Sequence, residues 1–159
     1  MATRAAIALG SNLGDCRAHL DYAVSRLAGL LEDIQVSSYI ETAPVGVPGH
    51  QGLFLNAAVV GDTMLPARAL LTQLLAIETD RGRERPFAGA ARTLDLDLIL
   101  FADRIIDEVG LIVPHPRFRS RQFVLEPLAE VAPKMIDPVT GKTVRELLNA
   151  LNDGGPGRT

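Results

Sequence analysis

Two aspartates alternate with leucines in one of the most apolar stretches of the chain. Segment 92–101 reads Arg-Thr-Leu-Asp-Leu-Asp-Leu-Ile-Leu-Phe, so a strand here has leucines on one face and Asp95 and Asp97 on the other. Aspartate is disfavoured in strands, and two on one face lie about 7 Å apart. Such a pair can hold one or two Mg²⁺ ions whose coordination is completed by a substrate phosphate. The alternative is a solvent-facing edge strand whose charges have no chemical role.

Basic residues surround this stretch in the sequence. Arg92 directly precedes it, and the loop before it carries Arg83 and Arg85. One guanidinium group can donate two hydrogen bonds to the oxygens of a phosphate, and it stays charged at neutral pH. The formal net charge of -3 argues against a general nucleic-acid binder. The local basic stretch instead indicates a small polyanion bound at one site, with a solvated charged face as the alternative.

A histidine stands between two prolines in a loop further along the chain. His115 is a candidate phosphate donor there, although a loop histidine without a role is also common. Arg117, Arg119 and Arg121 follow, and the sequence does not decide which of them faces a ligand. The chain has no Walker A lysine motif and no Ser-His-Asp or Cys-His pattern, so P-loop and covalent mechanisms have little support.

Hydrophobic periodicity and turn residues predict the elements that position these groups. Strands are expected at 4–9, 33–42, 53–60 and 92–101, helices at 15–31 and 66–81, and a long loop at 43–52. A short strand at 104–108 should pair with 92–101 through a turn at 102–103. Two or three short helices should follow, the last at about 143–151. This order predicts an α+β fold with a ferredoxin-like β-α-β-β-α-β core, an extra short strand and C-terminal helices.

The length of 159 residues fits one domain, with 153–159 expected as a frayed tail. The composition, 47% hydrophobic and 22% charged, is that of a globular protein. No apolar run is long enough to span a bilayer and no signal-peptide pattern is visible, so we expect a cytoplasmic protein that does not bind a membrane. The single cysteine, Cys16, has no partner for an internal disulfide.

Several short blocks, taken in order, resemble one family. They are 9–13, 37–42 with Pro44 and Gly46, 54–58, 92–97, 113–115, and Arg121 with Phe123 and 127–128. The chain is similar to the 6-hydroxymethyl-7,8-dihydropterin pyrophosphokinases of folate biosynthesis up to about residue 140. The resemblance implies transfer of a diphosphate from ATP to the hydroxymethyl group of the pterin, with release of AMP, by an enzyme that works as a monomer.

The resemblance also implies roles for individual residues. Two Mg²⁺ ions are expected on Asp95 and Asp97. Catalytic roles fall to Arg83, Arg92, Asp95 and Asp97. ATP contacts fall to Glu78, Arg83, Arg92, His115 and Arg121. The pterin is expected among Thr42, Val45, Phe54, Asn56, Asp95 and Phe123, with the two phenylalanine rings on either side of it.

Without the resemblance, Phe54 and Phe123 would be interpreted as core residues and Glu78 as a carboxylate on a helix surface. Two departures from the family pattern put ATP contacts in doubt. Ala90-Ala91 replaces a Gly-Pro pair, and Pro116 replaces an aromatic residue after the histidine. Competing functions are a ferredoxin-like RNA-binding module, which needs exposed aromatic residues on its sheet, and a two-metal nuclease.

Overall fold

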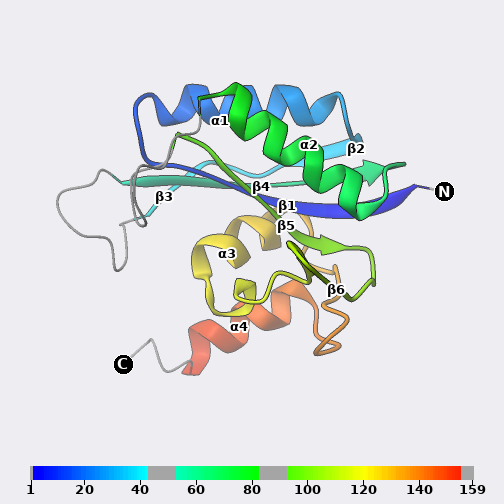
Figure 1. Ribbon diagram of the computed structural model, residues 1–159. Coiled ribbons are helices and arrows are strands. Elements are labelled where there is room, and N and C mark those ends of the chain that lie inside the picture. The colour runs from blue at the N-terminus through cyan, green and yellow to red at the C-terminus, as the bar shows by residue number, and fades with distance from the viewer. Residues whose placement is uncertain (1, 43–52, 83–92, 155–159) are drawn as a thin grey trace.

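A five-stranded antiparallel sheet lies in the middle of the molecule, with two helices on each of its faces (Figure 1). The computed structural model describes residues 2–42, 53–82 and 93–154. The elements are β1 (Thr3–Ser11), α1 (Cys16–Ala28), β2 (Glu32–Val36), β3 (Ile40–Thr42), β4 (Phe54–Thr63), α2 (Ala67–Asp80), β5 (Asp95–Phe101), β6 (Ile106–Glu108), β7 (Leu111–Val113), the 3₁₀ turn η1 (Phe118–Ser120), α3 (Gln122–Val131) and α4 (Val144–Gly154). The strand order is β2-β4-β1-β5, with β3 also paired to β4. With β2 and β3 taken as one strand, this is the predicted ferredoxin-like topology.

Helix α1 begins where the sequence indicates and ends earlier than predicted. The Asp15 side chain caps it by accepting a 3.1 Å hydrogen bond from the Ala18 amide. The helix stops at Ala28, not at residue 31. Leu31 leaves the helical path because it lies against Gly61 of β4, where an added Cβ would come within 2.8 Å of it. The periodicity of apolar residues therefore continued past the helix to Leu31, which is buried although it is not helical.

The strand predicted at 33–42 is interrupted by a bulge. Val36 pairs with Val59, whereas Ile40 pairs with Asn56, a shift of one residue in register. Between the two pairs, the Ser37 hydroxyl accepts a 2.8 Å hydrogen bond from the Ala58 amide. A side chain thus replaces a backbone partner, and the segment divides into β2 and β3.

The predicted pairing of 104–108 with 92–101 is wrong. A turn does form after β5, where the Arg104 amide donates to the Phe101 carbonyl at 3.0 Å. The following strand β6, however, pairs with β7 in a separate two-stranded sheet. Gly110, with φ +76°, permits the short turn between them. Strand β7 is not among the strands expected from the sequence.

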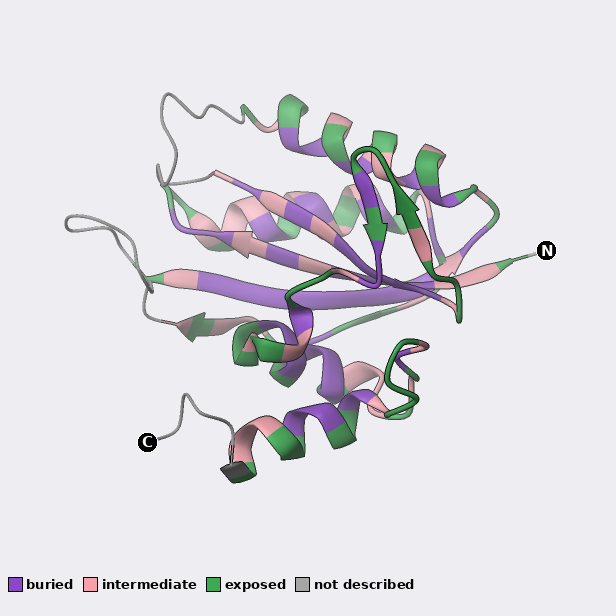
Figure 2. Ribbon diagram, turned by 60° about the horizontal axis from the view of Figure 1, so that its bottom comes forward, coloured by how far each residue is buried: buried purple, intermediate pink, exposed green. Residues whose placement is uncertain are grey.

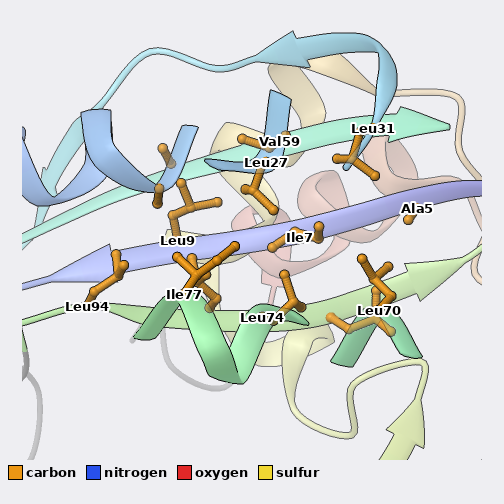
Figure 3. Packing of buried hydrophobic residues seen from close by; sticks show 14 of the residues in the cluster. Ala5, Ile7, Leu9, Leu27, Leu31, Val59, Leu70, Leu74, Ile77 and Leu94 are labelled. Carbon is orange, nitrogen blue, oxygen red and sulfur yellow. The ribbon is translucent and has the colours of Figure 1, made fainter. Parts of the chain in front are cut away.

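Buried residues lie along the sheet and on the helices that cover it (Figure 2), and their apolar side chains form one cluster on each side of the sheet. On the side of α1 and α2, the α2 residues Leu70, Leu74 and Ile77 are fully buried and point toward Ile7 and Leu9 of β1 (Figure 3). Each such side chain contributes about 1.5–3 kcal/mol by leaving water. The other side is filled from α3, α4 and η1. The helices therefore hold the sheet rigidly from two directions.

The ends of α2 agree closely with expectation, whereas α4 runs about three residues past its expected end. Pro66 caps α2, and Gly82 with φ +87° follows its end. Helix α4 continues to Gly154, so it includes the first residues of the segment predicted as a tail, and 155–159 lie outside the described residues. Among the described residues, no helix has the length and apolar character needed to cross a membrane.

Candidate active site

The register of β5 on β1 places both aspartates on the sheet face that α3 and α4 cover. Asp95 lies opposite Gly10 and Asp97 opposite Ala8, and Ala8 packs against the core of that face. The leucines that alternate with the aspartates belong to the core under α1 and α2. Directly opposed residues share a face. The predicted projection of two carboxylates from one face of a strand is therefore confirmed, and both side chains are half-buried.

Small residues separate the aspartates from a polar side chain on the next strand. Gly10 pairs with Asp95 on one side and with Asn56 of β4 on the other, so the three lie in one row across the sheet. A Cβ on Gly10 would lie 3.3 Å from Oδ1 of Asn56. Glycine therefore leaves room between the carboxylate and the amide. We had not assigned this role to Gly10, although it stands in one of the family-like blocks.

Three residues predicted to bind the pterin lie side by side on this face. Asn56 is 5% exposed, and its Nδ2 donates to the Thr42 hydroxyl at 2.7 Å. Phe54 pairs with Thr42 and is half-buried, so its interpretation as a core residue is wrong. The hydrogen bond fixes the Asn56 amide, so that Oδ1 lies on the side of Gly10.

The other predicted aromatic residue lies at the start of α3. Phe123 is 38% exposed, so it too is not a core residue. The Arg121 guanidinium lies 5.6 Å from the centre of its ring. Because α3 packs on β3 and β4 over the same sheet face, both residues belong to the side of the molecule that holds Asn56.

His115 is fastened to the aspartate-bearing strand. Its amide donates to the Ile99 carbonyl at 3.0 Å, two residues beyond Asp97. Burial lowers the pKa of His115; the charge of Asp97 opposes this shift and those of Arg121 and Arg117 reinforce it. The ring Nδ1 accepts from the Arg117 amide at 3.2 Å, so the neutral ring carries its proton on Nε2. That proton is suited to a phosphate oxygen.

One of the three arginines after His115 has another partner. Nε and Nη2 of Arg119 donate to the Asp137 carboxylate at 2.6 and 3.0 Å. Asp137 is fully buried and also accepts from the Val139 amide and the Thr140 hydroxyl. This ion pair occupies Arg119. Arg121 and Arg117, whose charges both act on His115, are thus the two arginines that the structure brings near this histidine.

The interpretation of Glu78 as a carboxylate on a helix surface is wrong. The residue is 3% exposed, and its Oε2 accepts a 2.7 Å hydrogen bond from the Leu96 amide. Sequence periodicity could have shown this burial, because Glu78 follows Leu70, Leu74 and Ile77 on the inner face of α2.

The remaining predicted residues lie outside the described part of the chain. These are Val45, Arg83, Arg92 and, among those of undecided role, Arg85. The loops at 43–52 and 83–91 and the Ala90-Ala91 departure lie there as well. Their roles remain predictions.

The donor set is suited to a magnesium ion that a substrate helps to hold. Within the described ranges, no group of three or more His, Cys, Asp or Glu side chains could hold a metal. Asp95 and Asp97 supply hard oxygen ligands on one face. Mg²⁺ is commonly bound by one or two carboxylates together with substrate phosphates and water. Two aspartates fit that arrangement, whereas they do not form a closed structural metal site.

Comparisons with known proteins agree with this geometry. Residues 6–133 match the family described as 7,8-dihydro-6-hydroxymethylpterin-pyrophosphokinase (HPPK). A 2-amino-4-hydroxy-6-hydroxymethyldihydropteridine pyrophosphokinase from Methylorubrum extorquens is 40% identical over 155 residues, which cover 96% of each chain. The protein of the same name from Synechocystis sp. is 40% identical over 93% of this chain and 76% of its own.

Solved structures show the same fold at lower identity. Wild-type HPPK-DHPS from Plasmodium falciparum has a TM-score of 0.74 and 15% identity over 94% of this chain. The match covers 45% of that chain, so this protein spans less than half its length. The shared fold and the sequence identity to the two pyrophosphokinases both support the same family. This chain therefore belongs to the 7,8-dihydro-6-hydroxymethylpterin-pyrophosphokinase family.

Proposed function

We propose that this protein transfers a diphosphate group from ATP to the hydroxymethyl group of 6-hydroxymethyl-7,8-dihydropterin, with release of AMP, in folate biosynthesis. Membership of the family supports the reaction. One structural observation carries the assignment to a site. Asp95 and Asp97 project from one face of β5, across Gly10 and Ala8 from the buried amide of Asn56. The aspartates proposed to hold the phosphates through Mg²⁺ thus lie close to the asparagine proposed to hold the pterin ring.

The two aspartates would hold two Mg²⁺ ions. Bound Mg²⁺ supplies positive charge that screens the triphosphate and orients the attacking hydroxyl. The chain's own part is to present the carboxylates on a strand that hydrogen bonds to β1 and packs on α2. These contacts hold the strand before any nucleotide binds, which favours preorganised electrostatic stabilisation.

Basic residues would bind the phosphate oxygens around this pair. We assign this role to Arg83, Arg92, His115 and Arg121, and catalytic stabilisation to Arg83 and Arg92 in particular. His115 is placed for it by its hydrogen bond to Ile99 and by the proton on Nε2. Glu78 is the last of the residues for which the resemblance implies a contact with ATP.

The pterin would lie on the sheet face beside Asp95. Phe54 and Phe123 offer partly exposed aromatic faces to a flat ring. Asn56 and the chain at Thr42 and Val45 would supply polar contacts to the ring edge. Because Thr42 already fixes the Asn56 amide, the ring would meet a group of defined orientation.

The bond changes follow from the two bound substrates. The hydroxymethyl oxygen bonds to the β-phosphorus, while the bond from that phosphorus to the oxygen bridging the α-phosphate breaks. AMP leaves with this oxygen, and the hydroxyl proton is released. The proposal includes an active monomer, since the residues assigned here come from one chain, and a cytoplasmic enzyme, which membership of the family supports.

The competing RNA-binding function has less support. Such domains stack bases on aromatic residues of an open sheet. Here the helices α1 and α2 cover one face and α3 and α4 cover the other (Figure 1). An open aromatic platform is therefore missing from the described sheet.

Mass spectrometry tests the proposed reaction. Incubation with Mg²⁺, ATP and the hydroxymethyl dihydropterin should yield AMP and the pterin diphosphate in equal amounts. A pterin with a methyl group in place of the hydroxymethyl group is the control and should yield neither product. ADP with a pterin monophosphate, or AMP without a modified pterin, would show that the proposed transfer is wrong.

A further inference from the structure

A buried carboxylate on α2 contacts the backbone between the two aspartates. Glu78 is 3% exposed, and its Oε2 accepts the Leu96 amide hydrogen at 2.7 Å. A buried amide left without an acceptor is costly, so this hydrogen bond matters for the backbone at Leu96. The Leu96 amide belongs to the residue that separates Asp95 from Asp97. The contact therefore acts on the part of the backbone that carries both carboxylates.

The position of Leu96 in the sheet explains why this amide is available. In the five-stranded sheet, β5 is the last strand in the order, with β1 on its inner side only. Amides along an antiparallel strand point alternately to its two sides. The Leu96 amide points to the outer side, toward α2. Glu78 gives this edge amide the partner that a further strand would otherwise supply.

The helix that carries Glu78 is firmly held. Leu70, Leu74 and Ile77 of α2 are fully buried against β1 and β5 (Figure 3). Glu78 is the next residue after Ile77 and lies in the last turn before the helix ends at Asp80. Strand β5 begins at Asp95. The hydrogen bond thus joins a rigid helix to the first residues of the strand, where the ladder to β1 also begins.

We propose that Glu78 is a positioning residue that fixes β5 at Leu96 and so sets the separation and direction of Asp95 and Asp97. The role rests on the proposed function, because it concerns the pair assigned to Mg²⁺. It differs from a direct ATP contact, since Glu78 acts through the backbone of another residue. Loss of the carboxylate should weaken metal binding without removing a metal ligand.

Three variants of the full chain separate these possibilities. Glu78→Ala removes the acceptor, and Glu78→Gln keeps a neutral acceptor oxygen of nearly the same size. Leu74→Ala is the matched control, because it damages the core from the same helix without touching the Leu96 amide. Melting temperatures show how far each variant is destabilised.

The first measurement is hydrogen exchange of the Leu96 amide by NMR in ligand-free protein. Glu78→Ala should speed this exchange by about tenfold or more relative to other amides of β5, in line with loss of a buried hydrogen bond. The second is the Mg²⁺ concentration that half-saturates binding of a non-hydrolysable ATP analogue. It should rise by about tenfold in Glu78→Ala, less in Glu78→Gln, and not in Leu74→Ala.

Each opposing result overturns the proposal. Unchanged Leu96 exchange in Glu78→Ala would show that the contact does not hold the strand. Faster exchange with an unchanged Mg²⁺ requirement, or an equal rise in Leu74→Ala, would remove the positioning role. Weaker analogue binding without Mg²⁺ in both Glu78 variants would indicate direct ATP contact instead. If the wild type shows no Mg²⁺-dependent binding, it is the proposed function that fails, while the exchange result still reports on the strand.

Discussion

The space beside the two carboxylates depends on side chains that are small or absent. Ala8 and Gly10 lie on β1 between the aspartates of β5 and the residues Asn56 and Ala58 of β4. A larger side chain on either would project from the same face. The β1 side chains between the aspartates and Asn56 are therefore small, as the proposed binding of phosphates and pterin side by side requires.

Gly10→Ala tests this at one position. The new Cβ would lie 3.3 Å from Oδ1 of Asn56 and should push the amide out of place. We expect KM for the pterin to rise about three- to tenfold, equivalent to roughly 1 kcal/mol, with a small change in melting temperature. Steady-state kinetics at saturating ATP would measure it.

The matched control is Gly29→Ala at the end of α1. There the Cβ meets only the Arg26 carbonyl, at the ordinary distance of 3.4 Å, and the backbone is in the right-handed helical region. Its KM for the pterin should equal that of the wild type. An unchanged KM in Gly10→Ala would mean that the row from Asp95 to Asn56 does not bound the pterin site.

Among the elements, η1 is held by an ion pair that the sequence did not indicate. Arg119 of η1 reaches Asp137, which lies in the segment between α3 and α4. The Arg121 amide in turn donates to the Phe118 carbonyl at 3.2 Å, and Phe118 is fully buried. The ion pair and the buried ring thus hold the turn that leads into Arg121.

Loss of Asp137 should destabilise the protein at neutral pH. Asp137→Ala leaves the Arg119 guanidinium, which is 27% exposed, without its buried partner. The expected loss is about 3–5 kcal/mol in the free energy of unfolding, measured by urea denaturation. Asp153→Ala, at an exposed position in α4, is the control and should change stability little.

The same pair predicts how stability depends on acid. Burial opposes ionisation of Asp137, but hydrogen bonds from Arg119, Thr140 and the Val139 amide outweigh it and lower the pKa. The stabilisation is therefore complete above the ordinary aspartate pKa of about 3.9 and is lost as pH falls through the lower folded value. Asp137→Ala should lack this part of the acid-induced loss. An identical acid dependence in the wild type and the variant would contradict the assignment.

A histidine joins the two helices on the other face of the sheet. Nε of Arg81, just after α2, donates to Nδ1 of His19 in α1 at 2.9 Å. Burial and the charge of Arg81 lower the pKa of His19. The folded protein thus favours the neutral form of His19. The stabilisation that His19 contributes is complete above the ordinary histidine pKa of about 6.5 and is lost as pH falls through the lower pKa of the folded state.

His19→Gln should therefore flatten the dependence of the melting temperature on pH between about 7.5 and 5.5. The wild type should lose more stability than the variant over this range, because protonation removes the acceptor for Arg81. Calorimetry at both pH values measures the difference. Equal losses in the two proteins would show that His19 does not couple the helices.

At the scale of the whole molecule, local sequence patterns predicted the features that depend on residues close together in the chain. Alternation of Asp and Leu set the faces of β5, and apolar spacing set the two helices that cover one side of the sheet. The order of these elements was enough to predict the ferredoxin-like topology, because few arrangements bury such faces.

The features that the sequence did not predict depend on partners far apart in the chain. The bulge at Ser37 requires the Ala58 amide, and the hydrogen bond of Glu78 requires the Leu96 amide on the outer edge of β5. Strand β6 pairs with β7, while the Ile99 carbonyl on the edge of β5 binds the His115 amide. Arg119 could be separated from Arg121 only by the position of Asp137. The residues next to each of these positions in the sequence do not indicate its distant partner.

The central claim is that Asp95 and Asp97 bind the nucleotide through Mg²⁺, and calorimetric titration with a non-hydrolysable ATP analogue tests it most directly. We predict that Mg²⁺ strengthens binding to the wild type by at least about tenfold and that Asp97→Asn abolishes this gain while the melting temperature stays close to that of the wild type. Glu32→Gln on β2, at the opposite edge of the sheet, should behave like the wild type. An undiminished effect of Mg²⁺ on binding to Asp97→Asn would contradict the account.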